Sequence, residues 1–129
     1  MSQPRILIID DDVHYAELAS TYLRLSGLVH GTVEHADTMD AGLRRLRDFA
    51  PDLVFLDNRL PPQTDYRSGL RKLREAGFGG PVIVQSACTA DDVFDDARKL
   101  GAAEVIDKFH LSDEMLMSLL RRHAPNCLN

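Results

Sequence analysis

Short, largely apolar runs recur along the chain and constrain its fold more than any other feature. The clearest runs cover residues 6–9, 53–56, 82–85 and 103–106. Near-continuous apolar runs of this length are typical of strands that are covered on both faces. The segments between them repeat apolar residues at helical spacing, and crossovers between parallel strands are almost always right-handed. The pattern therefore predicts an α/β fold with a doubly wound parallel sheet.

The remaining segments complete a prediction of five strands and five helices. A second strand is expected within residues 28–35, where the polar composition suggests a sheet edge. Five helices are expected. They cover residues 13–25, a segment that begins at Asp37 or Thr38 and ends before Ala50, a segment around Leu70 and Leu73 that closes at Ala76-Gly77, residues 91–100, and a segment from Ser112 or Asp113 that ends at Pro125. Because no repeat or linker interrupts this order, the sequence predicts one domain over residues 1–129, with a core at 5–123 and a tail at 124–129.

Composition excludes several classes of protein. The formal net charge of -5 argues against a general nucleic-acid-binding surface, which needs clustered cations. Cys88 and Cys127 are too few for a disulfide scaffold and favour a reducing compartment. No apolar stretch approaches the ~20 residues that span a membrane. The chain is therefore expected to be cytoplasmic, without nucleic-acid or membrane partners.

Polar residues follow the apolar runs, at the point where each predicted strand ends. They are Asp10, Asp11 and Asp12 after the first run, Asp57 after the run at 53–56, Ser86 after the run at 82–85, and Lys108 after the last run. Because parallel strands end at the same edge of a sheet, we expect these side chains to form one site.

The residue types at this edge suit phosphoryl transfer. Carboxylates without histidine or thiolate partners are hard oxygen ligands, which suit Mg²⁺. Asp57 stands alone after a central strand and is the best candidate nucleophile, whereas the neighbouring Asp10 and Asp11 are better placed to hold the cation. Lys108 would neutralise the oxygens of the transferred group, and Ser86 would donate a hydrogen bond to it.

In their order and spacing, these residues resemble the receiver domain of response regulators in two-component signalling. The likeness covers residues 5–123 and rests on Ile8-Ile9-Asp10-Asp11, residues 51–57, Leu60-Pro61, residues 81–87, Gly101-Ala102 and Lys108. It implies a flavodoxin-like (CheY-like) sheet with strand order 2-1-3-4-5. It also implies a chain that is not an enzyme beyond slow self-dephosphorylation.

The resemblance also implies a role for each site residue. Asp57 would be the phosphoacceptor, Ser86 the switch hydroxyl, and Lys108 the amine that faces the phosphoryl group. Mg²⁺ would be bound by Asp11, Asp57 and the backbone carbonyl of Arg59, and Asp10 would act on it largely through water. The phosphodonor would be a histidine kinase or a histidine phosphotransfer protein. The downstream protein is unknown, and its contact surface is expected on the fourth helix, fifth strand and fifth helix.

Two loops depart from the family pattern. The loop after Asp57 is about one residue longer than usual and lacks the usual glycine, so the start of the third helix is uncertain from sequence. Tyr66 and Arg67 in this loop are candidates to lie over the site. Phe109 follows Lys108 where the family has a proline with a cis bond, so we expect a trans bond there.

Three other positions are expected to modulate the site. Val105 occupies the place of an aromatic residue that normally moves with the switch hydroxyl, so this coupling should be weakened or rerouted. Arg59 and Cys88 stand two residues after the phosphoacceptor and the switch residue, where the family tunes the lifetime of the acyl phosphate.

Several alternatives stay open from sequence alone. The chain is expected to be a stand-alone regulator, either a phosphorelay intermediate or a regulator of a partner, but it is also compatible with a fragment of a longer regulator. A binding module that is not phosphorylated is favoured by the departures at Pro62, Val105 and Phe109. A small phosphatase is disfavoured because Asn58 and Arg59 supply no second acid. Finally, the aspartates at 10–12 can be read simply as caps of the first helix.

Overall fold

The computed structural model describes residues 4–25, 31–62, 65–88 and 94–128. Its centre is a five-stranded parallel sheet with the strand order β2-β1-β3-β4-β5. The strands are β1 (Arg5–Ile9), β2 (Thr32–Ala36), β3 (Leu53–Asp57), β4 (Val82–Ser86) and β5 (Glu104–Asp107). The predicted α/β class, doubly wound sheet and strand order are confirmed.

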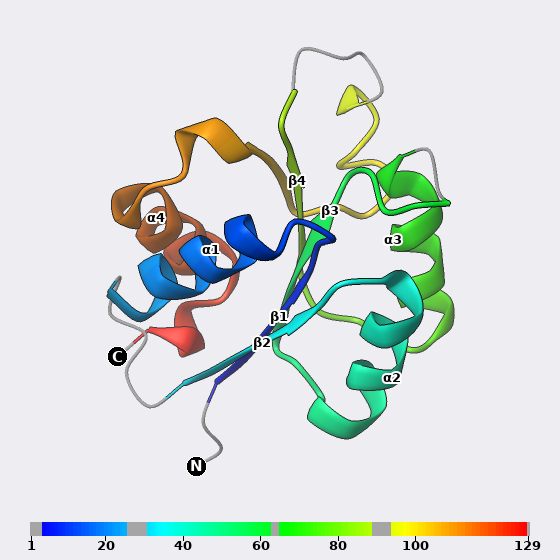
Figure 1. Ribbon diagram of the computed structural model, residues 1–129, viewed down its shortest axis with the longest axis horizontal. Helices are drawn as coiled ribbons and strands as arrows, with labels where there is room; N and C mark the ends of the chain where they lie inside the picture. Colours follow the sequence, from blue (N-terminus) through cyan, green and yellow to red (C-terminus); the bar gives the residue numbers. More distant parts are fainter. Residues whose placement is uncertain (1–3, 26–30, 63–64, 89–93, 129) are drawn as a thin grey trace.

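Helices cover both faces of the sheet (Figure 1). They are α1 (Val13–Leu25) and α4 (Asp113–His123) on one face, and α2 (Met39–Phe49) and α3 (Tyr66–Glu75) on the other, with the short 3₁₀ helices η2 (Lys108–His110) and η3 (Pro125–Cys127) on either side of α4 in the chain. Apolar spacing predicted all four α-helices, and tertiary packing of their apolar faces stabilises them.

Two apolar clusters lie on opposite sides of the sheet. Alternate residues of one strand enter different clusters, because successive side chains of a strand point to opposite faces. The α1–α4 cluster includes Ile8, Phe55, Ile83, Leu116 and Leu119. The α2–α3 cluster includes Ile9, Leu56, Val84, Met39 and Leu70.

Side-chain caps fix where the helices begin. Thr38 accepts a hydrogen bond from the backbone N–H of Ala41 at 3.0 Å, and Ser112 accepts one from Met115 at 3.1 Å, as their types predict. At the other end of α2, Ala50 has a positive φ of 50° and its N–H bonds the carbonyl of Leu46. These caps set the direction in which the chain enters the next strand.

Strand β2 forms the sheet edge, as its polar sequence predicted. Its residues Thr32 to His35 are exposed or half-buried, and only Ala36 is buried. The strand lies at the end of the predicted segment, and residues 26–30 fall outside the described part of the chain.

The predicted fourth helix at 91–100 was wrong within the described residues. Residues 89–93 lie outside the described part, and residues 94–101 form consecutive turns with short-range bonds such as Ala97 N–H to the Phe94 carbonyl. Only Ala97 of residues 94–100 is buried, and Leu100 is 47% exposed. This segment buries too little apolar surface to stabilise a helix.

The loop after β3 leads into a helix that begins at Tyr66. The side-chain oxygen of Asn58 accepts a hydrogen bond from the backbone N–H of Tyr66 at 2.9 Å, and Asp65 caps the helix by accepting from Arg67. Residues 63–64, which carry part of the lengthened loop, lie outside the described part. Tyr66 does not lie over the site as expected, because its ring is buried in the α2–α3 cluster and stacks on Phe94.

Candidate functional site

Three carboxylates come together where β1 and β3 end. Asp10 and Asp57 are buried, whereas Asp11 is exposed. One carboxylate oxygen from each residue lies within 4.8 Å of the others. Strand pairing explains this arrangement, because Ile9 of β1 lies beside Leu56 of β3, one residue before each aspartate. The predicted convergence of these three side chains is confirmed.

Lys108 joins the carboxylates from the end of β5. Its Nζ lies 2.7 Å from Oδ2 of Asp10 and 3.3 Å from Oδ1 of Asp57. Burial of the ammonium lowers its pKa, but the hydrogen bonds and charges of Asp10 and Asp57 outweigh burial and raise the pKa of Lys108. Lys108 is therefore a fixed positive charge in this site.

The carboxyl group of Asp57 is held in an environment that disfavours its charge. Burial and the neighbouring charge of Asp10 raise the pKa of Asp57 to about 7, although the charge of Lys108 opposes this shift. A divalent cation would remove this penalty, since it favours ionised ligands. A set of three carboxylates fits Mg²⁺, which binds through oxygen ligands and keeps several waters.

Two residues that the sequence analysis did not single out hold Asp10 in place. Gln85 donates a hydrogen bond from Nε2 to Oδ2 of Asp10 at 2.9 Å, and His35 contacts the backbone carbonyl of Asp10 through Nε2 at 2.6 Å. The backbone N–H of Asp12 donates to Oδ1 of Asp10. The signal for Gln85 was its position, a polar residue directly after the apolar residues 82–84 of a central strand.

Tyr15 lies beside the lysine and was also missed. Its ring centre is 4.7 Å from Nζ of Lys108, which is a cation–π distance. Burial and the charge of Asp10 raise the pKa of Tyr15 well above its ordinary value, so its hydroxyl stays protonated. In the sequence Tyr15 was indistinguishable from a residue on the apolar face of α1.

Ser86 ends β4 at the same edge of the sheet, but its hydroxyl has a local partner. Its Oγ donates to the backbone carbonyl of Cys88 at 2.9 Å and accepts from the Cys88 N–H at 3.2 Å. The structure therefore places Ser86 at the predicted edge, with its hydroxyl hydrogen-bonded to the backbone of Cys88. Cys88 itself is exposed.

The remaining predicted modulators lie in different environments. Arg59 is exposed beside the buried Asn58. Val105 is half-buried and packs against the α2–α3 cluster. Phe109 is 79% exposed, and its bond to Lys108 is trans as expected, since the one cis bond among the described residues joins Pro61 to Pro62.

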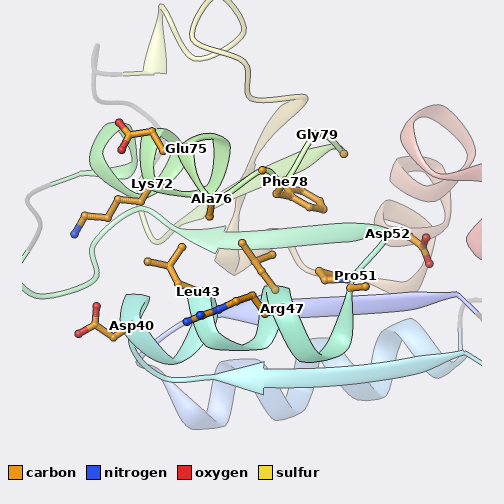
Figure 2. A pocket seen from close by; sticks show the side chains of 14 residues that line it. Asp40, Leu43, Arg47, Pro51, Asp52, Lys72, Glu75, Ala76, Phe78 and Gly79 are labelled. Atoms are coloured by element: carbon orange, nitrogen blue, oxygen red, sulfur yellow. The ribbon is translucent and has the colours of Figure 1, made fainter.

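A pocket of about 930 Å³ lies between α2 and α3, away from the carboxylates. Leu43 and Arg47 of α2 and Lys72 of α3 line it (Figure 2). Its other lining residues include Pro51 and Gly80, which precede β3 and β4, so it opens at the edge where these strands begin. The carboxylate cluster lies at the opposite edge, where strands end.

Comparison with known proteins gives the family. The sequence model of the response regulator receiver domain family matches residues 6–121, which is most of the chain. The chain belongs to this family. In the part of the receiver domain that the structure describes, no helix has the length and apolar character needed to cross a membrane.

Curated relatives are similar to this receiver domain over part of their own, longer chains. The receiver domain is 34% identical over 121 residues to the probable transcriptional regulatory protein SilR of Salmonella typhimurium. The aligned region covers 92% of this chain and 51% of the relative. It is 33% identical over 106 residues to a protein-glutamate methylesterase/protein-glutamine glutaminase of Rhodopseudomonas palustris, covering 81% of this chain and 28% of the relative. The chain thus spans about half or less of these relatives.

Solved structures share the fold of this receiver domain. The BeF3-activated N-terminal receiver domain of Klebsiella pneumoniae RstA matches with a TM-score of 0.78 and 26% identity, over 92% of this chain and 97% of that one. The receiver domain of a Luxo repressor protein described as putative, from Vibrio parahaemolyticus, matches with a TM-score of 0.83 and 20% identity, over 98% and 93% of the two chains.

Proposed function

We propose that this receiver domain accepts a phosphoryl group on Asp57 from the phosphohistidine of a histidine kinase or histidine phosphotransfer protein. The observation that carries the proposal is the buried Asp57 carboxylate, which lies beside Asp10 and Asp11 and 3.3 Å from the ammonium of Lys108. A nucleophile, candidate metal ligands and a fixed cation are the parts that phosphoryl transfer requires.

In this reaction an oxygen of Asp57 forms a bond to phosphorus while the bond between phosphorus and the donor nitrogen breaks. The electron pair leaves with that nitrogen. Lys108 neutralises charge on the phosphoryl oxygens, and Ser86 turns from the Cys88 carbonyl to donate to one of them. Mg²⁺, when bound, supplies charge neutralisation. Its proposed ligands are Asp11, Asp57 and the backbone carbonyl of Arg59, with Asp10 acting through water.

We propose that residues 5–123 form the functional unit and that it signals through protein contacts rather than by catalytic turnover. The contact surface is proposed on β5 and the elements that flank it. The names of the relatives describe transcriptional regulators and methylesterases, but this chain spans about half or less of their length. Both a stand-alone regulator and the receiver portion of a longer one are compatible with the site. We further propose a cytoplasmic location, without a direct nucleic-acid partner.

Mass spectrometry of intact chains tests the proposal. Wild type and Asp57→Asn are incubated with phosphoramidate, either with Mg²⁺ or with a chelator. We expect one phosphoryl increment in wild type with Mg²⁺, and none in the variant or with the chelator. Equal labelling of Asp57→Asn would contradict the assignment of Asp57. An unlabelled wild type would favour a binding module that is not phosphorylated.

A further inference from the structure

Asp10 is a fully buried carboxylate whose two oxygens both receive donors from the protein. Oδ2 receives Nζ of Lys108 at 2.7 Å and Nε2 of Gln85 at 2.9 Å. Oδ1 receives the backbone N–H of Asp12 at 2.9 Å. Three separate segments of the chain therefore fix this carboxylate, and Oδ2 depends on two side chains.

Gln85 reaches Asp10 from the strand next to Asp57. Asp57 of β3 and Gln85 of β4 are register partners, so their side chains leave the sheet on the same face. Gln85 must present Nε2 to Asp10, because a carboxylate only accepts hydrogen bonds. Its own Oε1 is buried and has no hydrogen-bond partner among the described residues.

An unpaired buried amide oxygen is unfavourable, and an apolar side chain at this strand position would avoid it. The other β4 residues at 82–84 are apolar and fully buried. The chain therefore carries an unfavourable group at the β4 position that donates a hydrogen bond to Asp10, which points to a role for the Gln85 donor in the site.

We propose that Gln85 is a positioning residue that keeps Oδ2 of Asp10 hydrogen-bonded when Lys108 moves from Asp10 to a phosphoryl group on Asp57. The inference rests on the proposed function. In this structure Lys108 is nearer to Asp10 than to Asp57. A phosphoryl group on Asp57 adds charged oxygens that attract the ammonium. Without Gln85, the departure of Lys108 would leave Oδ2 of a buried carboxylate with no donor from the protein side chains.

The test uses Gln85→Met in the full chain, since methionine has a similar length and no donor. Phosphorylation by phosphoramidate at saturating Mg²⁺ is followed by intact mass, and the Kd of Mg²⁺ is measured by calorimetry. We expect a rate constant about tenfold lower than that of wild type. The Kd should change less than about threefold, because Lys108 still pairs with Asp10 before phosphorylation. The control is Ile83→Val, which removes packing from the same face of β4 without contact with Asp10, and it should react at the wild-type rate.

A second background separates positioning from a general structural effect. The Lys108→Met variant has no lysine that could move away from Asp10 during phosphorylation. Adding Gln85→Met to this variant should therefore lower its phosphorylation rate constant by less than about twofold. The same tenfold loss in both backgrounds would overturn the inference, as would a Gln85→Met rate equal to wild type or a loss confined to Mg²⁺ affinity. An unlabelled wild type would overturn the proposed function together with the inference. A labelled wild type with an unaffected Gln85→Met would overturn the inference alone.

Discussion

The ammonium of Lys108 lies 4.7 Å from the centre of the Tyr15 ring, so an aromatic face covers one side of the charge that pairs with Asp10. The hydroxyl of the same tyrosine is buried and has no hydrogen-bond partner in the part of the chain that the structure describes. The ring therefore stabilises the site, while the hydroxyl opposes folding.

Removing this hydroxyl should stabilise the protein. Tyr15→Phe keeps the ring over Lys108 and is expected to raise the free energy of unfolding by about 1 kcal/mol, measured in urea. Tyr15→Leu loses the cation–π contact and should lower the free energy of unfolding. A Tyr15→Phe variant as unstable as Tyr15→Leu would show that the hydroxyl has a stabilising partner.

The pH dependence of stability should report the shifted pKa of Asp57. Burial beside Asp10 raises its folded pKa from 3.8 to about 7, so the folded state binds its proton more tightly than the unfolded state does. Without divalent cations, the contribution of Asp57 to the free energy of unfolding should fall as the pH rises from about 4 to about 7. Urea unfolding at several pH values in the presence of a chelator measures this slope.

Asp57→Asn provides the matched control for the pH experiment. The asparagine does not titrate, so the variant should lack this part of the pH dependence and should be more stable than wild type near pH 8. Saturating Mg²⁺ should reduce the difference, because the cation favours the ionised carboxylate. Identical slopes for the two metal-free proteins would show that Asp57 keeps an ordinary pKa.

Removing the lysine should destabilise the metal-free protein strongly. Lys108→Met leaves the buried charge of Asp10 without its ion-pair partner, and we expect a loss of about 3 kcal/mol. Mg²⁺ should restore more stability to this variant than it adds to wild type, since it replaces the missing positive charge. Thermal unfolding with and without Mg²⁺ measures both effects, and equal Mg²⁺ responses would contradict the prediction.

A pair of glycines tests the packing of the α2–α3 cluster. A Cβ atom at Gly42 would lie 2.6 Å from Cδ1 of the fully buried Ile9, whereas one at Gly79 meets nothing within 4 Å. Gly42→Val should therefore lower the free energy of unfolding by about 2 kcal/mol, because the side chain of Ile9 must shift within a packed core. Gly79→Val should change it by less than about 0.5 kcal/mol. Similar losses in urea unfolding would contradict this packing.

The sequence predicted the sheet and the carboxylate convergence because both follow from local patterns. Apolar runs give buried parallel strands, and parallel strands end at one edge, so Asp10, Asp11, Asp57 and Lys108 had to meet once the order of strands was right. The helix caps at Thr38 and Ser112 followed from residue type in the same way.

Contacts between distant segments were not predictable in this way. Tyr66 follows a polar loop, and its burial against Phe94 depends on how residues 94–101 fold back onto α3. A helix was predicted there from the apolar spacing of the sequence. The prediction was wrong because Leu100, one of those apolar residues, stays exposed and does not pack against the core. Gln85 and Tyr15 contact Asp10 and Lys108 only in the assembled fold, across separations that no periodicity encodes.

The sheet also acts as a partition. The two apolar clusters share no residue, so a change on the α2–α3 side reaches the carboxylates through the strands and through the hydrogen bond between Tyr66 and Asn58. Changes on the two sides should therefore have additive effects on unfolding. The chain contains no tryptophan. A reporter tryptophan introduced on α2 would make folding visible by fluorescence while leaving the chemistry on the other side undisturbed.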